Sequence, residues 1–155
     1  MPAKTKRTKR AKPRKRAASP RRVKRRAPES LRLRAMSASL TVADLDRSTA
    51  WYQDVLGFTL GERWEEGAHV RGVQMKAGRC DLLLNQDDFQ KGRDRAKGLG
   101  VRLWLSTAQD LDAVAARARA QGAVLDQVPR HTSWGAYVFM ITDPDGFQLT
   151  VVREE

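Results

Sequence analysis

Polar and apolar side chains follow a repeating pattern after the first part of this chain. Residues 36–43 alternate between apolar and polar side chains, which predicts a strand with one buried face. An amphipathic helix is predicted next, because Asp44 or Asp46 can cap its first turn with a carboxylate. Gly57 supplies a left-handed residue at its end. The pattern therefore predicts a strand, then a helix, and then a glycine that ends the helix.

A looser copy of this unit begins at residue 99. Alternation places Arg102 and Trp104 on one face of its first strand and aliphatic residues on the other. Asp110 opens the next helix and Gly122 closes it. Further strands are predicted at residues 58–64, 69–76, 79–85, 123–128, 135–142 and 147–153.

Repetition of a whole supersecondary unit predicts two similar modules packed together. The expected fold class is α+β, with paired βαβββ modules at residues 36–85 and 99–153. Their mixed sheets would curl around a cleft inside one domain of residues 35–155. Function is expected in that cleft, because ligand sites are concave.

Positive charge is concentrated at the start of the chain. The 155 residues carry a formal net charge of +12, yet residues 1–34 hold 16 Lys and Arg against one acid, Glu29. The remaining residues hold 14 basic and 17 acidic side chains. A segment this polar cannot bury enough surface to offset its chain entropy, so residues 1–34 are predicted to be a disordered tail.

Such a tail is expected to bind polyanions such as nucleic acid by counterion release, without reading base sequence. No aromatic residues lie among its cations, so base stacking is not expected. The alternatives are a solubilising extension or a start assigned upstream of the true one. The cations expected to act are Lys4, Lys6, Arg7, Lys9, Arg10, Lys12, Arg14, Lys15, Arg16, Arg21, Arg22, Lys24, Arg25 and Arg26.

The sequence also bounds the cellular compartment. It has no secretory h-region and no apolar run long enough to span a bilayer. Its single cysteine, Cys80, excludes an intramolecular disulfide and fits a reducing compartment. A cytoplasmic protein that does not associate with membranes is expected.

The order of these elements resembles the vicinal oxygen chelate superfamily, which includes glyoxalase I, extradiol dioxygenases, fosfomycin-resistance proteins and bleomycin-resistance proteins. Two segments carry the resemblance, LTVADLDRSTAWYQDVLGF and SWGAYVFMITDPDGFQLTVV, and it covers roughly residues 36–153. It implies modules that surround a central cavity, often completed by dimerisation, so a homodimer is expected.

Enzymes of that superfamily hold a divalent metal with a His on the first strand of a module and a Glu on the last. Those positions fall here on Ser37, about Gly100, Thr150, and Leu82 or Leu83. Hydroxyl groups alone do not hold a catalytic divalent ion firmly, so no metal cofactor is expected. The alternative is a relocated site, for which no spacing gives a signal, built from His69, His131, Asp81 or Cys80.

The resemblance then favours the metal-free branch, similar to the bleomycin-resistance proteins. A cleft with aromatic and cationic walls would sequester a small organic ligand by stacking, cation–π contact and charge pairing. The residues expected to bind it are Ser37, Ser39, Thr41, Arg102, Trp104, Trp134, Tyr137, Phe139 and Thr150. For Tyr137 and Phe139, packing in the core is the alternative.

Three functions therefore stay open. The first is a metal-independent small-molecule-binding protein. The second is an enzyme of the same fold, a lyase, isomerase or dioxygenase with a relocated metal or an acid–base pair. The third is a nucleic-acid-associated protein that acts through its basic tail.

Overall fold

The first helix begins where a carboxylate is available to accept a bond from a free backbone amide. In the computed structural model, which describes residues 34–154, helix α1 spans Leu45–Leu56. The backbone N–H of Arg47 donates to Asp44 Oδ1 over 2.9 Å, which selects Asp44 over Asp46 as the N-cap. Gly57 ends the helix at φ 74°, as predicted.

The second helix, α2, spans Leu111–Ala120 and begins in the same way. Asp110 is its N-cap and accepts a bond from the backbone N–H of Asp112. At the other end Ala123 N–H still donates to the carbonyl of Ala118. Because Ala123 is still hydrogen-bonded to the last turn of α2, the strand predicted from residue 123 starts two residues later.

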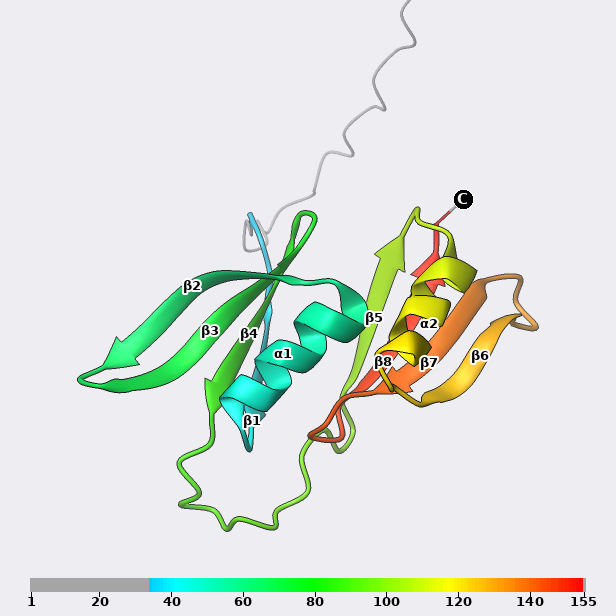
Figure 1. Cartoon of the computed structure of the whole chain (residues 1–155). Helices are drawn as coiled ribbons and strands as arrows, with labels where there is room; N and C mark the ends of the chain where they lie inside the picture. Colours follow the sequence, from blue (N-terminus) through cyan, green and yellow to red (C-terminus); the bar gives the residue numbers. More distant parts are fainter. Residues whose placement is uncertain (1–33, 155) are drawn as a thin grey trace, which may run out of the picture. The chain divides into compact units, whose positions relative to one another are not determined.

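Eight strands form two four-stranded sheets (Figure 1). The first sheet has the order β1-β4-β3-β2, with β1 at Ala38–Val42, β2 at Thr59–Glu66, β3 at His69–Ala77 and β4 at Cys80–Gln86. The second has the order β5-β8-β7-β6, with β5 at Arg102–Thr107, β6 at Leu125–His131, β7 at Tyr137–Thr142 and β8 at Gln148–Arg153. In each sheet one pair, β1 with β4 or β5 with β8, is parallel and the others are antiparallel. The predicted α+β fold of two βαβββ modules with mixed sheets is confirmed.

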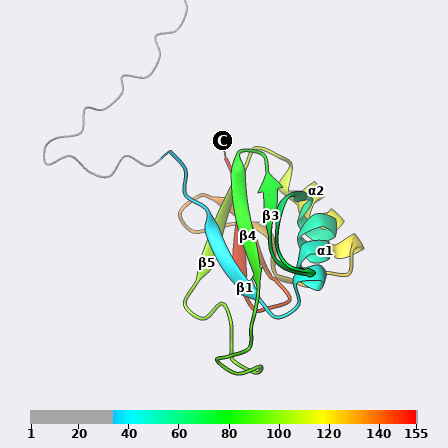
Figure 2. The same cartoon turned by 90° about the vertical axis from the view of Figure 1, so that its left-hand side faces the viewer.

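Each helix covers one face of the sheet of its own module. Helix α1 contacts β2, β3 and β4, and α2 contacts β6, β7 and β8. Figure 2 shows α1 against one side of its sheet. The face of each sheet that carries no helix of its module is called its open face below.

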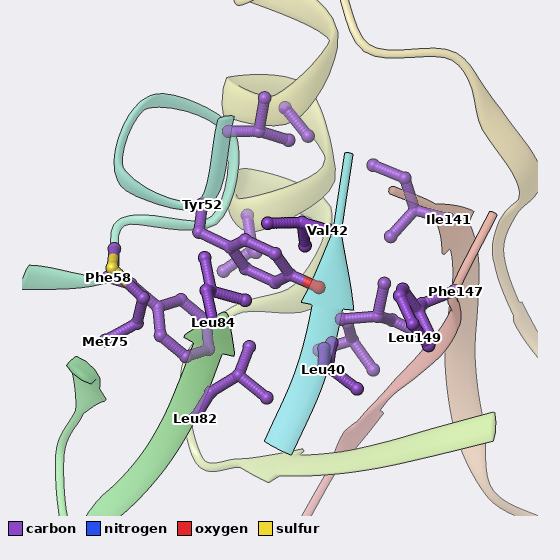
Figure 3. Close-up of a cluster of buried hydrophobic side chains, with 14 of the residues drawn as sticks. Leu40, Val42, Tyr52, Phe58, Met75, Leu82, Leu84, Ile141, Phe147 and Leu149 are labelled. Atoms are coloured by element: carbon purple, nitrogen blue, oxygen red, sulfur yellow. The ribbon is translucent and has the colours of Figure 1, made fainter. Parts of the chain in front are cut away.

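One hydrophobic core joins the two modules. Leu40 and Val42 of β1 belong to the same buried cluster as Ile141 and Leu149 of the second module (Figure 3). Tyr52 of α1 is fully buried in this cluster. Residues 35–155 consequently form one compact unit.

The turn between β7 and β8 also joins the modules. Its sequence, DPDG, predicts only a turn between the last two strands, but its carboxylates reach the first module. Asp145 accepts bonds from Ala43 N–H at 2.7 Å and from Ser48 Oγ at 2.9 Å. Asp143 accepts one from the Tyr52 hydroxyl at 2.9 Å. This turn therefore helps to fix the start of α1.

An ion cluster holds the connection between the modules. Asp87, buried directly after β4, lies 3.1 Å from the buried Lys97 ammonium and 2.9 Å from the Arg95 guanidinium. Further along, Gly98 has φ 71° and passes so close to the backbone of Gly146 that a Cβ there would clash with it. The connection between the modules is thus held in place at several points.

Two expectations concern other parts of the chain. Among residues 34–154, no helix is long and apolar enough to cross a membrane. The cations expected to bind polyanions, from Lys4 to Arg26, lie outside the described residues.

Candidate functional site

A cross-strand row of side chains runs over the open face of the second sheet. Trp104 of β5 is opposite Thr150 of β8, Thr150 is opposite Met140 of β7, and Met140 is opposite Gln127 of β6. Paired residues of neighbouring strands point to the same side of a sheet. The alternating residues Leu149 and Val151 belong to the helix-side core, so the row faces away from it.

The centre of this open face is buried although α2 lies on the opposite side of the sheet. Thr150 is only 1% exposed, and its neighbours on the same face, Val138 and Val152, are buried without belonging to the common core. Trp104, at the β5 edge of the row, is 54% exposed. The result is an apolar floor with an indole ring at its rim.

Two polar atoms on this face have no partner. Among residues 34–154, Thr150 Oγ1 and Gln127 Nε2 are the buried side-chain atoms that make no hydrogen bond. Buried polar groups are bonded in the great majority of cases. Both atoms come from one row and flank Met140.

Charged groups of opposite sign lie at the two sides of the row. Arg102 of β5 shares the face of Trp104, and its guanidinium donates to Gln148 Oε1 over 2.6 Å. On the other side, Asp126 of β6 accepts a bond from the Thr142 hydroxyl at 2.6 Å. The β5 side of this face thus offers a cation and the β6 side a carboxylate.

The placement of Arg102, Trp104 and Thr150 on one face agrees with the alternation of the sequence. Tyr137 and Phe139 lie on the opposite face of β7, as the alternative of core packing expected. Phe139 is fully buried in the common core. The Tyr137 hydroxyl bonds to the Asp112 carboxylate of α2, and that bond raises the pKa of Tyr137. Because β7 alternates, Val138 and Met140 face the open side in their place.

The other expected ligand residues are distributed elsewhere. Trp134 lies exposed in the turn between β6 and β7, and Ser37 lies exposed before β1. Ser39 and Thr41 point to the open face of the first sheet, where Asn85 Nδ2 donates to Ser39 Oγ over 2.8 Å. The predicted set is therefore not brought together, and only Arg102, Trp104 and Thr150 share one face.

The open face of the first sheet carries an aromatic side chain that the sequence reasoning missed. Its row runs from Thr41 through Asn85 and Gly72 to Trp64. A Cβ on Gly72 would lie 3.0 Å from the Trp64 ring, so the indole covers this glycine. A glycine inside a predicted strand is a signal for such close approach. Gln127 and Met140 were missed too, because the register of β6 is irregular.

The positions expected to hold a metal in this fold do not supply suitable donors. Thr150 and Leu83 face the open sides of their sheets, and Gly100 lies in a turn at φ 70°. With Ser37, the set contains two hydroxyls and no imidazole or carboxylate. Divalent ions in such enzymes need those stronger donors, so these residues do not fit a metal.

The four residues of the relocated alternative are not brought together. His131 is the last residue of β6, and the centre of its ring lies 4.8 Å from the centre of the Tyr137 ring. Asp81 pairs with Lys76, and Cys80 and His69 are exposed at strand starts. Within the described part of the chain, no three His, Cys, Asp or Glu side chains form a group that could hold a metal ion.

Comparisons with known proteins place these features in a family context. The family described as "Glyoxalase/Bleomycin resistance protein/Dioxygenase superfamily" matches residues 34–151. A search of curated proteins finds no match.

Several solved structures are similar to this chain. TioX from Micromonospora sp. ML1 is 22% identical with a TM-score of 0.64, over 77% of this chain and 98% of that one. TnmS3, described as an antibiotic binding protein from Streptomyces sp. CB03234, is 25% identical with a TM-score of 0.63. The match covers 82% of this chain and 100% of that one. A lactoylglutathione lyase from Agrobacterium tumefaciens is 24% identical with a TM-score of 0.59. The match covers 81% of this chain and 95% of that one.

Proposed function

Because this chain belongs to the glyoxalase/bleomycin resistance protein/dioxygenase superfamily, we propose that it binds a small organic molecule on the open face of its second sheet. The observation that carries the proposal is the exposed Trp104 beside a buried floor that includes Thr150 and Val152. An aromatic ring beside an apolar surface is typical of ligand sites. The similarity to TnmS3, an antibiotic binding protein, supports a binding role.

The binding would rest on stacking and charge. A planar ring placed on the Trp104 indole gains aromatic contact beyond the area that it buries. Arg102 lies on the same face and offers a guanidinium to an anionic substituent. The ligand class that fits best is a planar aromatic anion.

The proposed binding does not use a divalent metal. Ser37 and Thr150 stand at positions where His and Glu would be needed, and hydroxyls bind such ions weakly. Elemental analysis of the purified protein should find no stoichiometric zinc, nickel, iron or manganese. About one such ion per chain would overturn this part of the proposal and favour an enzyme.

The binding itself is tested with fluorene-2-carboxylate, a planar aromatic anion, and is measured by isothermal titration calorimetry. Trp104→Ala should weaken binding about tenfold, the effect of roughly 1.4 kcal/mol of lost stacking and burial. Trp134→Ala is the matched control, because Trp134 lies in an exposed turn. Unchanged affinity in Trp104→Ala, or no binding by the wild-type protein at millimolar concentration, would contradict the proposal.

We also propose that the protein is a homodimer. Strands β1, β2, β5 and β6 are at sheet edges, and the open face of the first sheet carries the exposed Trp64, which a second copy would shield. Sedimentation should give twice the chain mass of 17.5 kDa. A clean monomer at micromolar concentration would contradict the dimer.

A second function rests on the charge of residues 1–34. With 16 basic residues and one acid, this segment would bind nucleic acid without sequence preference. The full chain should bind duplex DNA with steep salt dependence, and a chain that begins at Ala35 should not. If the full chain and the shortened chain bound DNA with equal affinity, the binding would belong to the domain and not to residues 1–34.

A further inference from the structure

We infer that Gln127 and Thr150 select the ligand by a hydrogen-bond-accepting oxygen, such as a ketone or phenolic oxygen, carried on two or three fused planar rings. This inference rests on the proposed function and specifies the chemistry of the same site. It follows from the two unpartnered polar atoms on the open face of the second sheet.

The energetic argument begins with burial. A buried polar atom without a partner destabilises a protein by about 1 to 3 kcal/mol. Thr150 is 1% exposed, and a valine of the same shape in its place would leave no unpaired hydroxyl in the apolar floor formed with Val138 and Val152. A bound molecule that displaces the side chains covering these two atoms would supply the missing partners. Two such atoms in one row make a single recognition element.

The donor chemistry selects the ligand group. The amide nitrogen of Gln127 only donates, and the Thr150 hydroxyl can donate as well as accept. A ketone or phenolic oxygen satisfies both, whereas a hydrocarbon leaves both unpaired. Discrimination against a molecule that lacks the acceptor is expected to be stronger than discrimination by shape.

The row also limits the size and orientation of the ligand. Trp104 and Gln127 are separated by three strand spacings, about 14 Å at 4.8 Å per strand. Fused rings stacked on Trp104 would extend over Thr150 and Met140 toward Gln127. An anionic substituent belongs at the Arg102 side, because Asp126 lies on β6 at the other side.

Two probes of the same shape and charge test the inference. 9-Oxofluorene-2-carboxylate and fluorene-2-carboxylate differ by one ketone oxygen. The wild-type protein should bind the ketone roughly thirtyfold more tightly, as two additional buried hydrogen bonds predict. Gln127→Leu and Thr150→Val should each reduce this preference, and the double variant should abolish it.

Gln74→Leu is the matched control. Gln74 lies on the open face of the first sheet, where its Oε1 accepts from Glu62 N–H, and its loss should leave the preference intact. Equal binding of both probes by the wild-type protein would overturn the inference and leave the proposed function standing. Binding of neither probe would overturn both.

A second readout does not depend on any ligand. Because Thr150 Oγ1 and Gln127 Nε2 lack partners, Thr150→Val and Gln127→Leu should raise the thermal midpoint of the unliganded protein. A lowered midpoint in both variants would mean that these atoms are satisfied within the protein, and would overturn the inference.

Discussion

The Tyr52 hydroxyl offers the sharpest test of how the two modules are joined. It donates to Asp143 Oδ2 over 2.9 Å, across the boundary between the modules. Tyr52→Phe removes this bond and keeps the ring, which packs edge-on against Trp51 at 5.0 Å and Phe58 at 5.5 Å. The core therefore stays filled, and the variant isolates one hydrogen bond to a buried carboxylate.

The expected loss follows from the surroundings of Asp143. Its Oδ1 keeps the backbone N–H groups of Asp145 and Phe147, at 2.9 and 2.8 Å, whereas its Oδ2 loses the Tyr52 donor. A hydrogen bond to a buried charged group contributes about 2 kcal/mol, so the free energy of unfolding should fall by about that amount. For a domain of this size the thermal midpoint should fall by about 8 °C.

The pH dependence of the loss identifies its cause. Burial raises the pKa of Asp143 above its ordinary value, and the bond from Tyr52 opposes that rise. Without the bond the folded protein holds the proton more strongly. The loss should therefore be largest above the pKa of Asp143, where the carboxylate is charged, and should shrink as the pH falls below it.

Urea unfolding of both proteins from about pH 3 to pH 8 measures this difference. Tyr137→Phe is the control, because its hydroxyl bonds the carboxylate of Asp112 on the exposed surface and should not change stability measurably. A Tyr52→Phe loss that is independent of pH, or below about 0.5 kcal/mol, would refute the reasoning.

Three further perturbations have defined outcomes. The stability that protonated Asp143 contributes is complete below the ordinary pKa of Asp, about 4, and is lost as the pH rises through its raised folded pKa. The stability of Asp143→Asn relative to wild type should therefore increase as the pH rises above about 4 in urea titrations. Gly98→Ala should lower the thermal midpoint well beyond Gly100→Ala, because both have positive φ but only Gly98 faces neighbouring backbone; equal losses would contradict this. The bond from the Phe89 amide lowers the pKa of Asp87, so this carboxylate stabilises the wild-type fold above about pH 4 and stops doing so as the pH falls through the lowered pKa. Asp87→Asn should remove this stabilisation. Acid unfolding curves that are unchanged in the variant would contradict the prediction.

The fold could be predicted from the sequence because the residue patterns that specify its elements are local. Alternation in residues 36–43 and the caps at Asp44 and Asp110 act within a few residues, and each appears in the structure where it was expected. The strand predicted at 123–128 was displaced to Leu125–His131, because the end of α2 uses Ala123. Boundaries of this kind depend on hydrogen bonds that the residue pattern does not encode.

The candidate site could be predicted only in part from the sequence, because it depends on the long-range register of the strands. Alternation along β5 was enough to place Arg102 and Trp104 on one face. The partnership of Thr150 with Met140 and Gln127 requires the pairing of three strands, one of them irregular, and no local pattern reports it. Phe139 illustrates the opposite difficulty, since an aromatic residue next to a site has the same appearance in the sequence as a core residue.

The bonds that Asp145 accepts from Ala43 and Ser48 have a thermodynamic consequence for the whole domain. Since the first turn of α1 uses acceptors from the far end of the chain, the first module cannot reach its native state while the second is unfolded. The two repeats should then melt in a single transition, although each has its own sheet and helix. A molecule bound to the second sheet alone would raise the melting temperature of both, and amide protons of β1 and β3 would exchange more slowly although nothing touches them.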